Sequence, residues 1–325
     1  KHTNKVFENM ARIIVFLWLI VFSFGFLNAA GKSPLLKTAK KELNRSFEGL
    51  QKEENPPYFI SYHITDKEEV RLTASFGKLE DDQHTHNRIL DIDLRVGDHK
   101  FDNTHIIRGQ PFQFGSRSGS ANLPLEDHST AIRNVIWNST DIAYKSAIER
   151  YDKALTNKAV KVEEEDTSAD FSHEKPYTYY GELTDINPDL DKYRAMVKRL
   201  SAKFAGNDWL YSGEVIFMGD MLKKYFVSTE GSEIQMPENY FRIYIRAKTK
   251  ADDGMSLPIY ESYFAFNPGN LPPEEKIAKD IDDMIQLLDE LRKAPKLQTT
   301  YSGPAILSGE ASGVFFHEIL GHRVE

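Results

Sequence analysis

Residues 88–97 read RILDIDLRVG, and apolar side chains alternate strictly with charged ones along this stretch. The apolar positions are Leu90, Ile92, Leu94 and Val96, and the charged ones between them are Asp91, Asp93 and Arg95. Because successive side chains of a strand point to opposite faces, this pattern predicts a β-strand with one buried and one wet face. Two strand-like runs precede it, YFISYHIT at 58–65 and EEVRLTASFG at 68–77. The three runs together predict an antiparallel meander.

A helix is predicted on each side of this meander. In PLLKTAKKELNRSFEGLQKE, residues 34–53, apolar residues recur every three or four positions, which is typical of a surface helix with one buried stripe. These apolar residues are Leu35, Leu36, Ala39, Leu43, Phe47 and Leu50. A second helical region is predicted at about 128–155, after a stretch rich in Gly, Ser and Pro.

The second half of the chain is predicted to be richer in strands. After a helix predicted at 190–204, aromatic and β-branched residues dominate four runs, at 210–219, 223–231, 239–249 and 259–266. A last helix is predicted between Pro272-Pro273 and Ala294-Pro295. The predicted fold class is α+β: an N-terminal helix plus antiparallel meander domain at 31–215, then a strand-rich second domain at 216–325 that is incomplete here.

The amino-acid composition and the net charge limit the classes of function to be considered. The 325 residues are 40% hydrophobic and 28% charged, as in globular proteins, and the formal net charge of −8 comes without a long basic run. A nucleic-acid partner is therefore not expected. With no cysteine, any metal site within these residues must use histidine and carboxylates. The acidic segment VEEEDTSADFSHE, 162–174, is interpreted as a solvated loop and not as a cation site. Four further histidines are interpreted as structural or solvated: His63, His84, His86 and His105.

The N-terminus has the pattern of a secretory signal. Residues 13–27 read IIVFLWLIVFSFGFL without a charge, after Lys5 and Arg12 and before the small residues around Ala29. We expect residues 1–30 to be a signal peptide, so that the protein is exported to the periplasm of a bacterium or outside the cell. The alternative is an uncleaved anchor; in either case membrane contact is expected only through this segment.

A candidate metal motif lies near the C-terminus, where His317 and Glu318 are adjacent and His322 follows five residues after the first histidine. Neutral imidazoles bind zinc, and a neighbouring carboxylate can take a proton from water. On a regular helix, five residues at about 100° each place two side chains roughly 140° apart, too far to share an ion. Either a wider turn of the π type interrupts the helix, or the backbone bends at Gly321. We predict a local irregularity at Leu320 to His322.

The residues around the motif carry a family resemblance. YSGPAIL at 301–307, then Gly309-Glu310-Ala311 and FFHEILGHRVE, are preceded by KKYFVSTEG at 223–231 and KAPKL at 293–297. Over about residues 205–325 the sequence closely resembles the TldD/PmbA family of zinc metallopeptidases, also called modulators of DNA gyrase. Arg323 stands where a small residue is usual in that family.

The resemblance implies a zinc-dependent peptidase acting on unfolded or short peptides. It implies that His317 and His322 bind Zn²⁺ and that Glu318 is the general base that activates a metal-bound water. The family's third ligand is a cysteine, so the resemblance also implies a chain truncated after the zinc motif and a fragment without activity.

The resemblance further implies a homodimer or a heterodimer with a related subunit, while the export signal argues against a role with gyrase. Two alternatives remain at this point: a non-catalytic binding or assembly subunit of the same architecture, and a metal-sequestering protein of the cell envelope.

Overall fold

One long, curved β-sheet organises the computed structural model, which describes residues 31–107, 120–160, 168–296 and 298–324. The sheet has seven strands in the order β3-β2-β1-β5-β6-β4, with β7 also paired to β6. Its strands are β1 (Pro57–Ser75), β2 (Lys78–Val96), β3 (Ala121–Asn122), β4 (Thr178–Tyr180), β5 (Ser212–Ser228), β6 (Glu233–Lys250) and β7 (Ser256–Ala265). All pairings are antiparallel except that of β4 with β6.

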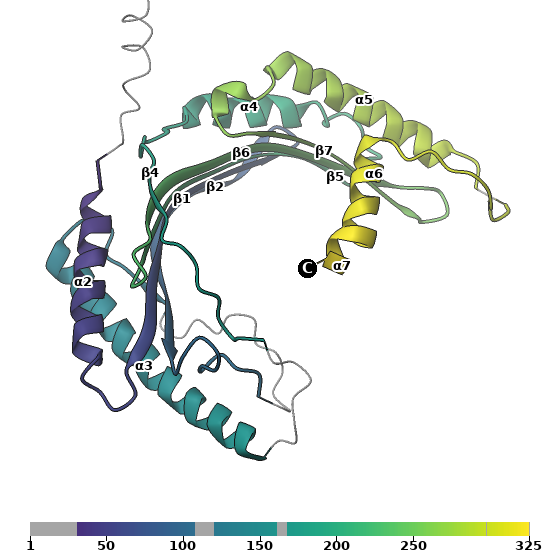
Figure 1. Ribbon diagram of the computed structural model, residues 1–325. Coiled ribbons are helices and arrows are strands. Elements are labelled where there is room, and N and C mark those ends of the chain that lie inside the picture. The colour runs from purple at the N-terminus through teal and green to yellow at the C-terminus, as the bar shows by residue number, and fades with distance from the viewer. Residues whose placement is uncertain (1–30, 108–119, 161–167, 297, 325) are drawn as a thin grey trace, which may run out of the picture.

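Four helices cover the convex face of this sheet (Figure 1). They are α2 (Pro34–Leu50), α3 (Ser129–Val160), α4 (Leu190–Ala202) and α5 (Glu274–Lys293). At one end of the sheet, α2 and α3 enclose a core that includes the fully buried Leu43 and Ile60. At the other end, α4 and α5 enclose a second core that includes Phe241 and Ile281. The same long strands therefore supply side chains to two separate cores.

The α+β fold class is confirmed, and the helices begin and end close to their predicted bounds. The strands differ in length. The runs predicted at 58–65 and 68–77 form the single strand β1, and those predicted at 210–219 and 223–231 form the single strand β5. Asp66 and Lys67, which lie between the two predicted runs, continue the ladder because β1 pairs on both sides through them.

The domain boundary expected between residues 215 and 216 falls inside β5. This strand pairs with β1 on one side and with β6 on the other, so the described residues before and after the boundary share one sheet. The predicted signal peptide, residues 1–30, lies outside the described residues. Within the described ranges, no helix combines the length and the apolar character needed to span a lipid bilayer.

The concave face of the sheet carries partly exposed aromatic residues. In β6 the buried residues Phe241, Ile243 and Ile245 face the helices, so the residues between them face the concave side. Among these, Tyr244 stacks on Tyr260 of β7 with ring centroids 5.7 Å apart. Phe264 and Phe266 continue the aromatic surface toward the end of β7 and are 47% and 68% exposed. The helices α2 to α5 leave this face uncovered (Figure 1).

A candidate metal centre

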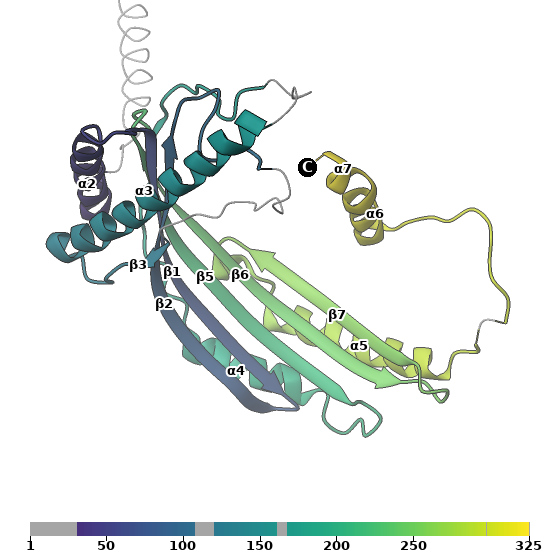
Figure 2. The same cartoon turned by 90° about the horizontal axis from the view of Figure 1, so that it is seen from below.

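The predicted motif lies on a short helical segment that stands apart from the sheet in the view of Figure 2. It consists of α6 (Gly309–Phe316), the π-helical turn η2 (His317–Gly321) and α7 (His322–Val324). Its apolar side chains are exposed: Val314, Phe315, Phe316, Ile319, Leu320 and Val324. Since contiguous exposed apolar surface marks contact sites in soluble proteins, this segment has the character of one that packs against further protein.

The irregularity predicted near Leu320 to His322 is present, and it is the wide turn, one of the two options left open by the sequence. The backbone N–H of His322 donates to the carbonyl of His317, five residues earlier, which is the hydrogen bond of a π turn. Gly321 lies within this π turn and does not have a positive φ, so the turn does not use the left-handed backbone that glycine adopts most easily. The extra residue in the turn therefore rotates His322 back toward His317, as the i, i+5 spacing requires.

The turn brings the three predicted side chains together. The rings of His317 and His322 meet edge to face with centroids 4.6 Å apart. The carboxylate Oε2 of Glu318 lies 3.9 Å from Nε2 of His322. One ligand atom from each of the three residues can be chosen so that all lie within 4.8 Å of one another. Two imidazoles beside a carboxylate form a donor set that suits Zn²⁺, so the residues present fit the implied ion.

All three side chains are exposed in the described part of the chain. Exposure leaves them open to a substrate, and the two imidazole rings also contact each other edge to face. Positioning here comes from the backbone hydrogen bond of the π turn. The local structure therefore supplies convergence, whereas the desolvation that strengthens electrostatic catalysis requires further covering groups.

The histidines interpreted as structural or solvated lie elsewhere. His86 contacts Asp66 at 2.6 Å, and Asp66 also binds the buried Arg88. His105 contacts the Asp170 carboxylate at 2.8 Å. His84 lies 3.5 Å from Glu68, and His63 is half-buried within β1. His86, His105 and His84 each lie beside a carboxylate of the same fold.

A second group of possible ligands was not found from the sequence. His99, His173 and Glu230 offer ligand atoms that also lie within 4.8 Å of one another. They come from three loops separated by as many as 131 residues, so no local motif signals them. The only sequence signal was the clustering of acidic residues and a histidine in 162–174, which was interpreted as a solvated loop; residues 161–167 lie outside the described ranges.

Comparisons with known proteins give structural neighbours only. No protein-family model matches the chain, and no curated protein matches it by sequence. A candidate modulator of DNA gyrase from Thermotoga maritima is 15% identical, with a TM-score of 0.43 over 76% of this chain. Another from Bacteroides thetaiotaomicron is 10% identical, with a TM-score of 0.46 over 77% of this chain. TldE from Thermococcus kodakarensis is 10% identical, with a TM-score of 0.40 over 78% of it.

These names are those of the family that the C-terminal motif resembles. The chain spans about half the length of the neighbours, 48%, 49% and 47% of them respectively.

Proposed function

We propose that this protein is a zinc-dependent peptidase of the TldD/PmbA kind that acts on unfolded or short peptides. The observation that carries the proposal is the π turn at His317–Gly321, which makes a spacing of five residues converge on one point. A helix that lacked this turn would hold the two imidazoles apart. π turns inside helices occur frequently at functional sites, which supports the same reading of the motif.

Each residue of the motif has a role in this proposal. His317 and His322 would hold a zinc ion through ring nitrogens, and the bound ion would supply Lewis acidity at neutral pH. Glu318 would take a proton onto a carboxylate oxygen from the water whose oxygen bonds to the peptide carbonyl carbon, and would pass that proton to the amine nitrogen as the C–N bond breaks. A catalytic zinc usually has three protein ligands. We propose that the third is a cysteine outside these 325 residues, as the resemblance implies.

The concave face of the sheet supports a peptide as the substrate. It is uncovered by α2 to α5 and presents aromatic rings beside the guanidinium of Arg242, whose Cζ lies 5.8 Å from the Phe264 ring centroid. Aromatic and cationic side chains on an extended surface can contact peptide side chains of varied sequence. We propose that an unfolded or short peptide lies along this face while it is cleaved.

We further propose that the protein is exported, and that it works as a homodimer or as a heterodimer with a related subunit. The exposed aromatic side chains of Phe315 and Phe316 support a protein contact at the motif segment. The same observation favours the second candidate function, a binding or assembly subunit in which the motif has no catalytic role. The two candidates differ in what Glu318 does.

The test measures zinc content per chain and peptide hydrolysis for the full-length protein, Glu318→Gln and the double variant His317→Asn/His322→Asn. We expect zinc in the native protein and in Glu318→Gln, hydrolysis in the native protein alone, and less zinc in the double variant. Loss of one general base typically lowers turnover by about 10²- to 10⁴-fold. The matched control is Glu275→Gln, which changes an exposed carboxylate on α5 and should leave both readouts unchanged.

Unchanged hydrolysis in Glu318→Gln would reject the role of Glu318. A full-length protein that binds zinc at the motif and hydrolyses no peptide would instead favour the assembly subunit. A native protein without zinc at His317 and His322 would reject both the metal centre and the peptidase.

A further inference from the structure

Three loops meet at the end of the sheet that α2 and α3 cover. β1 pairs with β2 and β5 so that Ser61 lies opposite both Asp93 and Ser228. This register places the loop that follows β2 beside the turn that joins β5 to β6. His99 lies in the first and Glu230 in the second, although they are 131 positions apart. Hydrogen bonds in both directions between Ile60 and Thr229 fix the β5–β6 turn against β1.

The third loop, which carries His173, is held on both sides of this histidine. On one side, the N–H of Phe171 donates to the carbonyl of His99 at 3.0 Å. On the other, the N–H of Tyr177 donates to Oγ of Ser232 at 3.0 Å, and the N–H of Glu233 donates to the carbonyl of Tyr177. His173 is thus held between the loop of His99 and the turn of Glu230 by backbone contacts that do not involve its own ring.

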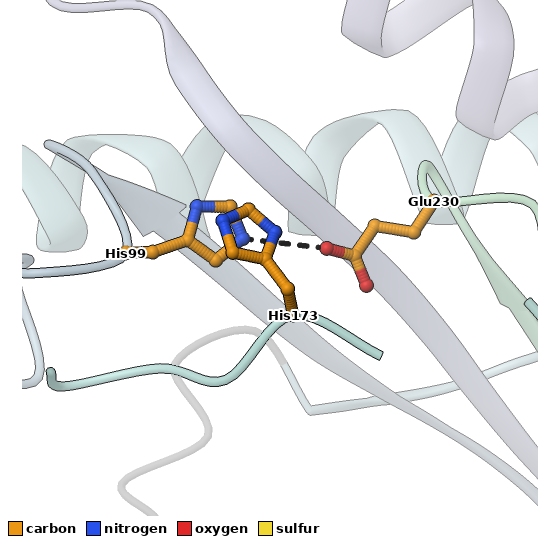
Figure 3. Close-up of side chains that lie close together, drawn as sticks. All are labelled: His99, His173 and Glu230. Carbon is orange, nitrogen blue, oxygen red and sulfur yellow. Dashed lines mark hydrogen bonds and ion pairs between the residues drawn. The ribbon is translucent and has the colours of Figure 1, made fainter. Parts of the chain in front are cut away.

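The side chains of these loops converge on one point (Figure 3). The imidazoles of His99 and His173 stack with ring centroids 3.5 Å apart and an interplanar angle of 24°. Nε2 of His99 lies 3.4 Å from Oε1 of Glu230, and ligand atoms of all three residues lie within 4.8 Å of one another. Figure 3 shows the Glu230 carboxylate directed toward the stacked rings.

These distances suit a shared cation better than a direct hydrogen bond. An N–H···O hydrogen bond is usually about 2.7–3.2 Å long, so 3.4 Å is long for the pair His99 and Glu230. Two ligands of a tetrahedral zinc ion, each about 2.0–2.1 Å from the metal, are roughly 3.3 Å apart.

The residues around the cluster restrict the orientation of His99 and balance the nearby positive charge. Tyr58 and Phe171 pack on the His99 ring at centroid distances of 4.6 and 5.8 Å and restrict its orientation. Arg95, whose guanidinium lies over the Phe171 ring, is paired with Asp93 and Asp102. Its positive charge is therefore compensated and does not oppose a cation nearby.

We propose that His99, His173 and Glu230 bind a divalent zinc-class metal ion at a second site, separate from the C-terminal motif. Two imidazoles and one carboxylate match the borderline softness of Zn²⁺. His173 is the exposed member, so its ring turns most easily to open the stack and aim a nitrogen at the ion. The ion fastens the loop of residues 168–177 to the ends of β2 and β5, and its role is structural stabilisation of that loop.

The test separates the two sites by removing the motif first. In the full-length variant His317→Asn/His322→Asn, equilibrium dialysis against Zn²⁺ is expected to leave one zinc equivalent per chain. Adding His173→Asn should weaken this binding more than about 100-fold. Mutation of a residue that only hydrogen-bonds to a metal ligand already lowers metal affinity by about 10- to 100-fold. The matched control adds His84→Asn, which removes another exposed histidine, and is expected to keep the zinc equivalent.

A second readout follows the loop itself. Zinc should slow hydrogen exchange at the amides of Phe171 and Tyr177, and should not do so after His173→Asn. Because His173 is exposed, this variant is expected to fold, which its denaturation midpoint without zinc verifies. The proposal is overturned if the motif variant binds no zinc, or if its zinc survives His173→Asn. Neither result bears on peptide hydrolysis, so the two proposals fail independently.

Discussion

Replacing Gly321 with alanine tests how the motif reaches its geometry. An added Cβ at this position would meet Nδ1 of His317 at 3.6 Å and Cγ at 4.0 Å, which are ordinary van der Waals distances. The φ of Gly321 is not positive, so alanine can adopt the same backbone. Since glycine inside a helix costs about 0.5–1 kcal/mol relative to alanine, the change is expected to stabilise the turn by about that much.

Converted to affinity, about 0.5–1 kcal/mol corresponds to a two- to five-fold tighter zinc Kd at most, because about 1.4 kcal/mol is tenfold. Calorimetric titration of the full-length protein with Zn²⁺ measures this. Gly313→Ala is the matched control, since its Cβ would enter open space within the same segment, away from His317. A tenfold loss of zinc affinity in Gly321→Ala alone would refute the reasoning, because it would mean that the site requires a backbone that only glycine adopts.

Two further predictions concern stability. Gly213→Ala should destabilise the protein by about 1–3 kcal/mol in urea denaturation, because its Cβ would lie 2.6 Å from Cβ of the fully buried Phe204. Gly49→Ala, where the added Cβ enters open space, should not destabilise the protein. Equal denaturation midpoints for the two variants would contradict this prediction. Burial alone would raise the pKa of Glu233, but its contacts with Lys32 and Tyr180 bring it below the ordinary value of 4.5. The stability that the ionised Glu233 contributes is complete above pH 4.5 and is lost as the pH falls through its lowered pKa. Glu233→Gln should therefore reduce the loss of stability at acidic pH, whereas Glu275→Gln should leave it unchanged.

The sequence predicted the helices more accurately than the strands for a physical reason. Helix α5 shows its buried stripe, including Ile277 and Ile281, within twenty neighbouring residues, and prolines mark where it starts and stops. The length of β1 depends on pairing with β5, which lies far along the chain. Asp66 looks like an interruption locally, yet it is buried and bound by Arg88 of β2. The partner that keeps it in the sheet cannot be deduced from the run itself.

The two candidate sites also differ in how far they could be predicted from the sequence. The motif of His317 and His322 is local, and the spacing of five together with helix geometry led to the π turn that the structure has. The cluster of His99, His173 and Glu230 depends on the register of β1 with two strands and on the loop that ends at Tyr177. Residue types alone therefore gave no reason to join these three positions.

The central pairing of β1 with β5 also has a consequence for synthesis of the protein on the ribosome. Roughly 140 residues separate the two strands, so at about 5–20 residues per second the edge of β1 waits on the order of 7–30 s for its partner. During that time the β1–β2 hairpin exposes a ladder of unpaired backbone groups, the kind of edge that recruits other strands. Nascent chains of this protein should therefore depend on chaperones that shield residues 57–75 until residues 212–228 emerge.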